Sequence, residues 1–206
     1  GNHGAALIFK TDDLTQPAAI SFGDFPMSKP TGLVSGFVFN GDGFEDILFG
    51  GPGDYIFYET TGGINLVYGQ ALTAGSAEII CPDEVLSGPE MGDRAFLANS
   101  MAFVGDIDTD GCDEIAVGST YDISNSGAFY LLWGGGSACG NLPEISLVTG
   151  DSGSALGSDL SGGMDFDSDG IPDILVSEPS AYQYFSDQGK IWGLSRKFEK
   201  RIFTGE

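Results

Sequence analysis

The sequence is poor in basic residues. It contains 8 Lys and Arg against 30 Asp and Glu, which gives a formal net charge of −22. A protein that binds nucleic acid needs a basic surface to contact phosphates, so this composition argues against a nucleic-acid partner. Disorder is common in acidic chains, but here 41% of the residues are hydrophobic and 15 are phenylalanine, which predicts a folded core.

Histidine and cysteine are also scarce. His3 is the only histidine, and the three cysteines show neither CxxC nor Cys/His spacing, so a zinc site is not expected. Gly150-Asp151-Ser152-Gly153 resembles the nucleophile segment of a serine protease, but such a serine needs a base, usually histidine. A carboxylate pair for glycoside hydrolysis is compatible with so acidic a chain, yet the clustered acids are better explained as metal ligands. The sequence therefore predicts a protein that is not an enzyme.

Long apolar runs and sustained helical periodicity are absent. No run approaches the ~20 residues of a membrane-spanning helix, so no transmembrane segment is expected. The chain begins with Gly1 and shows no signal peptide, which we interpret as a processed or trimmed chain. Short apolar runs alternate with turns rich in the 33 glycines. This pattern indicates many short strands, buried on both faces of stacked sheets.

An acidic loop is repeated three times. We number each loop from one to nine and define the first loop as residues 38–46, the second as 106–114 and the third as 165–173. Position five is Asp42, Asp110 or Asp169, and these residues are 68 and 59 positions apart. Each loop is followed by an apolar run and, after a polar stretch, by a second run led by glycine. The repeat period is therefore near sixty residues.

The repeats divide the chain into four parts. A further strand-like run follows the glycine-led run in two repeats, AEIICP near Ala77 and EISLV near Glu144. The glycine-led run GAALIF at Gly4 and the run AAISF at Ala18 indicate that the chain enters part-way through a repeat. We expect one domain, 1–206, with a partial leading repeat (1–25) and three repeats that follow (26–80, 81–148 and 149–206).

The chemistry of the second loop is that of a hard cation site. Its carboxylates are at alternate positions, and a glycine at position six permits a sharp turn. Calcium takes six to eight oxygen ligands, whereas magnesium prefers tighter octahedral sites and is the second choice. The expected ligands are the side chains of Asp106, Asp108, Asp110 and Glu114 and the backbone carbonyl of Cys112.

An EF-hand shares the D-x-D-x-D-G start but requires a glutamate at position twelve and flanking helices. Position twelve is Val117 or Val176, within an apolar run, so an EF-hand is excluded. The alternative is a set of acidic hairpin turns without metal.

The other two loops differ in completeness. The third loop offers Asp165, Asp167, Asp169, the carbonyl of Ile171, and Asp173. The first loop has Val38 at position one, which leaves Asn40, Asp42, the carbonyl of Phe44, and Asp46. We expect two strong Ca²⁺ sites and a third that is weak or empty.

The pattern D-x-D-x-D-G-x-x-D, followed by an apolar strand and a glycine-led strand, resembles the FG-GAP repeat of integrin α-subunit β-propellers. Ala155-Leu156-Gly157-Ser158 matches part of the upstream motif. The resemblance implies an all-β fold with propeller-type blades of about four antiparallel strands, in roughly three and a half repeats. Family propellers commonly have seven blades, so these blades would be completed by other chain segments or subunits. It also implies that the loop joins the first two strands of a blade and binds calcium.

The resemblance implies an extracellular or cell-surface module that mediates adhesion by binding a protein or glycan. Two alternatives stay open: a self-assembling subunit of a filament or surface layer, whose partners are copies of itself, and an accessory domain of a secreted hydrolase.

The cysteines and the basic residues can be placed as well. In a blade whose strands alternate in direction, the turns that contain Cys112 and Cys139 lie at the same end, so a disulfide between these two cysteines is a hypothesis. Cys81 is expected to be a buried thiol. Five of the eight basic residues crowd the last seventeen positions and form a basic tail that is either solvated or docked on a neighbour.

Overall fold

The fold is known from a computed structural model. It describes residues 5–10, 13–22, 32–51, 63–69, 78–80, 84–87, 97–120, 126–135, 144–179, 189–194 and 203–204. Every regular element within these ranges is a β-strand. No helix in this part of the chain is long and apolar enough to cross a membrane.

The strands form four sheets, which we number along the chain. The first sheet has the order β1 (Ala5–Lys10), β2 (Asp13–Phe22) and β6 (Glu78–Ile80). The second has the order β3 (Gly32–Phe37), β4 (Asp46–Gly51), β5 (Gly63–Val67) and β7 (Glu84–Ser87). The third has the order β15 (Phe203–Thr204), β11 (Glu144–Thr149), β10 (Ala128–Trp133), β9 (Glu114–Ser119) and β8 (Leu97–Gly105). The fourth has the order β12 (Leu160–Met164), β13 (Asp173–Glu178) and β14 (Lys190–Leu194).

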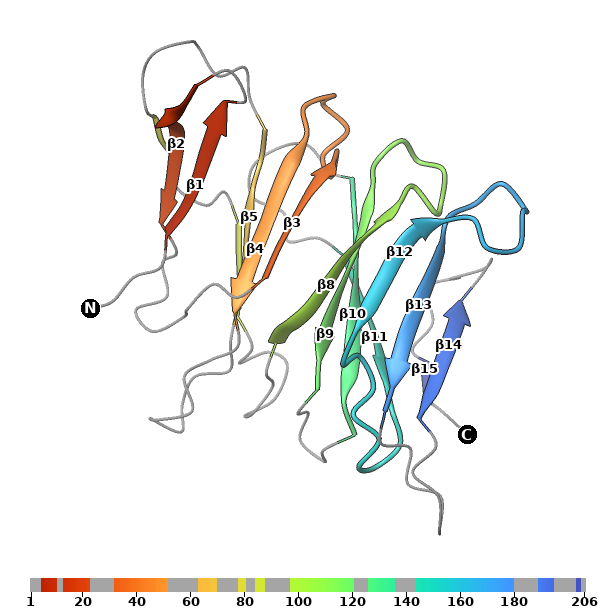
Figure 1. The fold of residues 1–206 in the computed structure, drawn as a ribbon. Coiled ribbons are helices and arrows are strands. Elements are labelled where there is room, and N and C mark those ends of the chain that lie inside the picture. Colours follow the sequence, from red (N-terminus) through yellow and green to blue (C-terminus); the bar gives the residue numbers. More distant parts are fainter. Residues whose placement is uncertain are drawn as a thin grey trace, which may run out of the picture.

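The sheets follow one another side by side, as propeller blades do (Figure 1). The three acidic loops connect β3 to β4, β8 to β9 and β12 to β13, and Figure 1 shows all three at the same end of the stack. The all-β fold with propeller-type sheets is therefore confirmed. The predicted leading strands are confirmed as well, because β1 and β2 form an antiparallel pair.

The third sheet is buried on both faces. Every residue of β9 and β10 is buried. Ile115 and Val117 of β9 pack against the second sheet, whereas Ala116 between them packs against the fourth. The side chains of a strand point alternately to opposite faces, so a continuous apolar run is what a doubly covered strand requires. This explains why the sequence shows apolar runs without strict alternation.

One predicted strand belongs to a different sheet. The run AEIICP was expected to be the fourth strand of its own repeat, but β6 pairs in parallel with β2 of the first sheet. The fourth strand of the second sheet is β7, which pairs antiparallel with β5. Near the C-terminus, β15 likewise pairs in parallel with β11, so it belongs to the third sheet although it follows the strands of the fourth in the sequence. An apolar run shows that a strand forms but not which edge it joins.

Two equivalent positions in successive repeats have the same unusual backbone. Ala98 and Gly157 each lie eight residues before position one of the next loop, and their φ angles are 64° and 79°. A left-handed conformation strains any residue with a Cβ atom by roughly 1–2 kcal/mol. At Gly157 space is also lacking, because a Cβ would lie 2.2 Å from the carbonyl oxygen of Ala128.

The pair gives a matched test of this backbone. Gly157→Ala should reduce the free energy of unfolding by about 2–5 kcal/mol, because left-handed strain adds to overpacking. Ala98→Gly should stay within about 1 kcal/mol of the parent chain, because relief of strain offsets the lost methyl burial and the added entropy of the unfolded chain. Urea unfolding of both variants measures the difference. Equal losses in the two variants would contradict this account of the two positions.

Candidate metal centre

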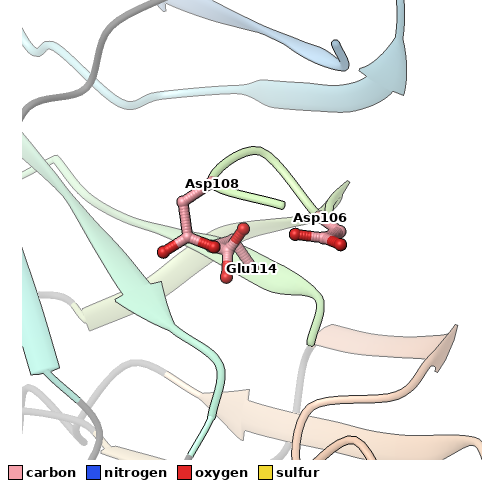
Figure 2. A group of neighbouring side chains, drawn as sticks. All are labelled: Asp106, Asp108 and Glu114. Carbon is pink, nitrogen blue, oxygen red and sulfur yellow. The ribbon is translucent and has the colours of Figure 1, made fainter. Parts of the chain in front are cut away.

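The second loop gathers three acidic side chains. Asp106, Asp108 and Glu114 each offer an oxygen, and these oxygens all lie within 4.8 Å of one another. Figure 2 shows the three carboxylates turned toward a common region beside the loop. Two like charges about 4 Å apart near a protein surface repel each other by about 4 kcal/mol. A divalent cation at this point would turn the repulsion into attraction.

Backbone amides hold these carboxylates in place. The two oxygens of Asp106 accept hydrogen bonds from the amides of Asp110 and Gly111, both at 3.0 Å. Asp108 Oδ1 also accepts from the Asp110 amide, at 3.2 Å, and Asp110 Oδ1 accepts from the Cys112 amide, at 2.9 Å. The loop therefore curls around its own acidic side chains.

The third loop repeats this geometry. Asp165, Asp167 and Asp173 form the second group of acids whose oxygens lie within 4.8 Å of one another. Asp165 accepts from the amides of Asp169 and Gly170 at 3.0 and 2.9 Å, the same positions that bond Asp106. Asp169 Oδ1 accepts from the Ile171 amide at 2.9 Å, as Asp110 does from Cys112. Two segments 59 residues apart thus adopt one structure.

The loop backbones share two left-handed positions. Position six is Gly43, Gly111 or Gly170, with φ between 85° and 93°. Position four is also left-handed, with φ of 71° at Gly41, 64° at Thr109 and 62° at Ser168. A β-branched residue rarely adopts this conformation, so the second loop is strained at Thr109. The sequence pattern points to the glycine at position six but gives no sign of the strain at position four.

Position nine is buried in all three loops. Asp46, Glu114 and Asp173 are at most 1% exposed. One oxygen of each accepts a hydrogen bond from the amide at position two, which is Phe39, Ile107 or Phe166. In the first two loops the other oxygen accepts a hydrogen bond from an amide just after the third strand of the sheet. Asp46 accepts from the Gly69 amide, after β5, at 2.7 Å, and Glu114 accepts from the Gly134 amide, after β10, at 3.2 Å. The position-nine carboxylate therefore ties the start of the loop to the end of the third strand.

The third loop leaves one such oxygen without a partner. Asp173 Oδ1 is buried, and no hydrogen-bond partner for it is found in the described part of the chain. A buried carboxylate oxygen without a partner costs about 1–3 kcal/mol or more. It belongs to the same residue that completes the acidic group with Asp165 and Asp167. A hard cation fits this donor set, and no residue beyond the predicted ligands is needed to form it.

Burial also affects titration at the site. Burial is the main cause that raises the pKa of Glu114 to about 8, and the charges of Asp108 and Asp110 add to it. Burial likewise raises the pKa of Asp46. The pKa of the Cys112 thiol is raised to about 11 by burial and by the neighbouring Asp110. These groups lie where negative charge is poorly solvated.

The first loop keeps the backbone but lacks part of the acidic group. Asn40 Nδ2 donates to Asp42 Oδ2 at 3.0 Å, and Asp42 Oδ1 accepts from the Phe44 amide at 2.8 Å. Val38 offers no carboxylate at position one. Among the described residues only the second and third loops form groups of three acids with clustered oxygens.

Some predicted residues have no test here. The structure shows the amides of Cys112, Ile171 and Phe44 as donors within their loops, and their carbonyls stay predicted ligands. Cys112 is partly buried and carries no disulfide in the structure. Because Cys81 and Cys139 lie outside the described residues, the bond from Cys112 to Cys139 stays a prediction for the oxidised chain. Of the basic tail, Arg196, Lys197, Lys200 and Arg201 lie outside them too. Ser152 lies in a turn in which the Ser154 amide donates to the Asp151 carbonyl at 3.0 Å.

Sequence reasoning missed residues that hold the loops from outside. Gly69 and Gly134 donate to the position-nine carboxylates from the end of the third strand, and Asp113, at position eight, bonds to the first loop. A glycine shortly after the third strand of the second and third sheets was a visible signal. No local pattern marks Asp113, because its partner lies 75 residues away.

Comparison with known proteins agrees with the fold and the loops. The model of the FG-GAP repeat matches residues 156–194. Integrin alpha-3 of Cricetulus griseus is 34% identical over 146 residues, which cover 68% of this chain and 13% of that protein. Integrin alpha-7 of Mus musculus is 30% identical over 188 residues, or 85% of this chain and 14% of that protein. Integrin alpha ina-1 of Caenorhabditis elegans is 29% identical over 164 residues, or 68% of this chain and 14% of that protein.

The stacked sheets and repeated acidic hairpins define a β-propeller type of repeat protein. Residues 156–194 match the FG-GAP repeat, and the chain is similar to part of the integrin alpha subunits. It spans about one seventh of the length of these relatives.

The buried position-nine acid of the first loop should stabilise the fold without metal. Asp46→Ala leaves two backbone amides without their acceptor and should reduce the free energy of unfolding by about 2–4 kcal/mol. Asp42→Ala is the matched control, because Asp42 is exposed and its loss should cost under ~1 kcal/mol. Urea unfolding in excess chelator measures both. Similar small losses in the two variants would show that the ties to Phe39 and Gly69 contribute little.

The predicted disulfide has a direct test. Peptide mapping of non-reduced chain, alkylated before digestion, should yield a linked peptide pair that contains Cys112 and Cys139, together with alkylated Cys81. Alkylation of Cys112 and Cys139 as separate peptides would exclude the bond.

Proposed function

We propose that this chain is a calcium-stabilised, non-catalytic module of an extracellular adhesion protein. The observation that carries the proposal is the pair of equivalent acidic groups in the second and third loops. The buried, unpartnered Asp173 Oδ1 supports it, because general acidic turns do not bury an oxygen without a donor. Calcium is favoured over magnesium because each loop offers five predicted oxygen-donor groups, which a bidentate carboxylate or bound water can bring to the six to eight oxygens of calcium, whereas magnesium usually keeps several waters and takes one or two carboxylates.

In each site the cation would be held by the acids at positions one, three, five and nine and by the carbonyl at position seven. Its contribution is electrostatic: it offsets the repulsion between acids and binds only the curled loop. A ligand that binds only the folded state stabilises it by about 2.7 kcal/mol at a concentration 100 times its dissociation constant. The first loop, without an acid at position one, is proposed as a weak or empty site.

The role in adhesion rests on similarity to integrin alpha subunits. Rigid sheets would present the connecting loops to a protein or glycan partner outside the cell. The repeat divisions expected from the sequence stay proposals, because β7, within 81–148, pairs with the second sheet, β6, within 26–80, with the first, and β15, within 149–206, with the third. Self-assembly into a filament or layer would appear as a mass that rises with concentration in analytical ultracentrifugation, whereas an adhesive module should keep a constant mass.

The metal role is tested by removal of one ligand. Asp169→Ala should weaken calcium binding at one site by at least about tenfold, equivalent to ~1.4 kcal/mol. It should also lower the melting temperature more in calcium, where a metal ligand is lost, than in chelator, where the change removes the hydrogen bond from the Ile171 amide but no ligand. Isothermal titration calorimetry and thermal unfolding with and without calcium measure the two effects.

Asp151→Ala is the matched control, because it removes one exposed acidic charge outside the loops. It should leave calcium affinity within about twofold, since an exposed charge at a distance is screened by salt. An equal loss of stability for Asp169→Ala in calcium and in chelator would reject the ligand role. Absence of calcium binding by the parent chain at millimolar concentration would reject the proposed function.

A further inference from the structure

The first loop lacks the brace that holds the other two. In those loops the position-one aspartate bonds the amides at positions five and six, which closes the curl from inside. Val38 cannot supply these bonds. Yet the first loop has the same left-handed backbone at positions four and six as the others. Something other than a position-one acid must therefore hold its start.

The second loop provides that support. Asp113 Oδ2 accepts a hydrogen bond from the Val38 amide at 2.7 Å, and the Asp113 amide donates to the Val38 carbonyl at 3.0 Å. One residue thus bonds both backbone groups of the position that lacks an acid. A third bond lies next to these, from the Gly135 amide to the Phe39 carbonyl at 2.8 Å.

Asp113 lies between two predicted ligands of the second site. The carbonyl of Cys112 precedes it and the carboxylate of Glu114 follows it. A cation held by both would fix the backbone on each side of Asp113. The Gly134 amide bonds Glu114 while the adjacent Gly135 amide bonds the first loop, so a second connection runs beside the first.

The next junction lacks this link, and there it is not needed. Position eight of the third loop is Pro172, which has no amide proton and packs against Gly105, where a Cβ would lie 2.9 Å from Pro172 Cγ. The loop before it has its own acid at position one, Asp106. A polar residue at position eight therefore occurs at the junction where the preceding loop is incomplete, and an apolar one where it is complete.

We propose that Asp113 couples the first loop to the cation site of the second, so that one bound cation orders both loops. This rests on the proposed calcium binding at residues 106–114. Asp113 acts as a positioning residue: it contacts the first loop and does not itself bind the ion. The first loop would then need no cation of its own to keep its shape.

Hydrogen exchange measured by mass spectrometry tests the coupling, with the full chain at a calcium concentration that saturates each variant. In the parent chain, calcium should slow exchange in peptides that cover 106–114 and also in those that cover 40–45. The effect on 40–45 should be at least about fivefold, the low end of typical coupling between sites. In Asp113→Ala, calcium should still protect 106–114, but its effect on 40–45 should fall below about twofold.

Three further variants separate this proposal from others. Asp106→Ala removes a ligand; at a calcium concentration that saturates the second site of the parent chain but not that of this variant, it should weaken the calcium effect in both loops together. Pro172→Ala changes the equivalent position of the third loop and should leave the effect on 40–45 intact. Asp113→Asn keeps an acceptor for the Val38 amide, so calcium should still slow exchange in 40–45, but by less than in the parent chain. This variant replaces Asp113→Ala in the test if Asp113→Ala does not fold.

The outcomes are distinct. Protection of 40–45 that persists in Asp113→Ala, or protection of 106–114 without any effect on 40–45 in the parent chain, would overturn the coupling and leave calcium binding in place. If calcium protects neither 106–114 nor 165–173 in the parent chain, the proposed function fails and the coupling fails with it.

Discussion

The buried carboxylate at position nine is the interaction on which each repeat depends. Asp46, Glu114 and Asp173 begin the second strand of their sheets, yet their side chains bond back to the start of the loop. A carboxylate that is hidden from water must be paired or strongly hydrogen bonded, otherwise its charge is too costly. Backbone amides meet this need in part. The side chain thus holds the loop in shape, and the loop amides in turn supply the hydrogen bonds that the buried carboxylate needs.

The three repeats meet the same requirement in different ways. The second loop pairs both oxygens of Glu114 with amides, and the third leaves one oxygen of Asp173 unpaired within the described residues. The first loop pairs both oxygens of Asp46 but has no acid at position one. Its start is held by Asp113 from the neighbouring repeat. Loss of a residue in one repeat is thus compensated by a contact between repeats.

Much of the fold and of the site could be predicted from the sequence because the pattern is local. Acids at alternate positions and a glycine at position six specify a curled loop. The structure brings oxygens of Asp106, Asp108 and Glu114 within 4.8 Å of one another, but the predicted ligand Asp110 is not part of this group. The apolar runs predicted strands covered on both faces, as β9 and β10 are.

What could not be predicted is non-local. The contact between Asp113 and Val38 joins residues 75 positions apart. The sheet that β6 joins depends on which strand edge is open, and the short run Glu78-Ile79-Ile80 does not specify that edge. The strain at Thr109 is also invisible, because threonine at position four is an ordinary choice for a turn whose φ is not known.

Stacked sheets make each repeat depend on its neighbours. In such arrays stability is approximately a sum of terms for each repeat and each interface. The third sheet has described neighbours on both faces, and its strands β9 and β10 are wholly buried. The fourth sheet packs against the third through Ile174 and Val176, whereas Phe166 and Ile191 are 75% and 76% exposed. The second loop lies at an interface with neighbours on both sides, so a cation bound there would contribute to more than its own repeat. The position of a loop within the stack, and not only its set of predicted ligands, would therefore determine how far the effect of a bound cation extends.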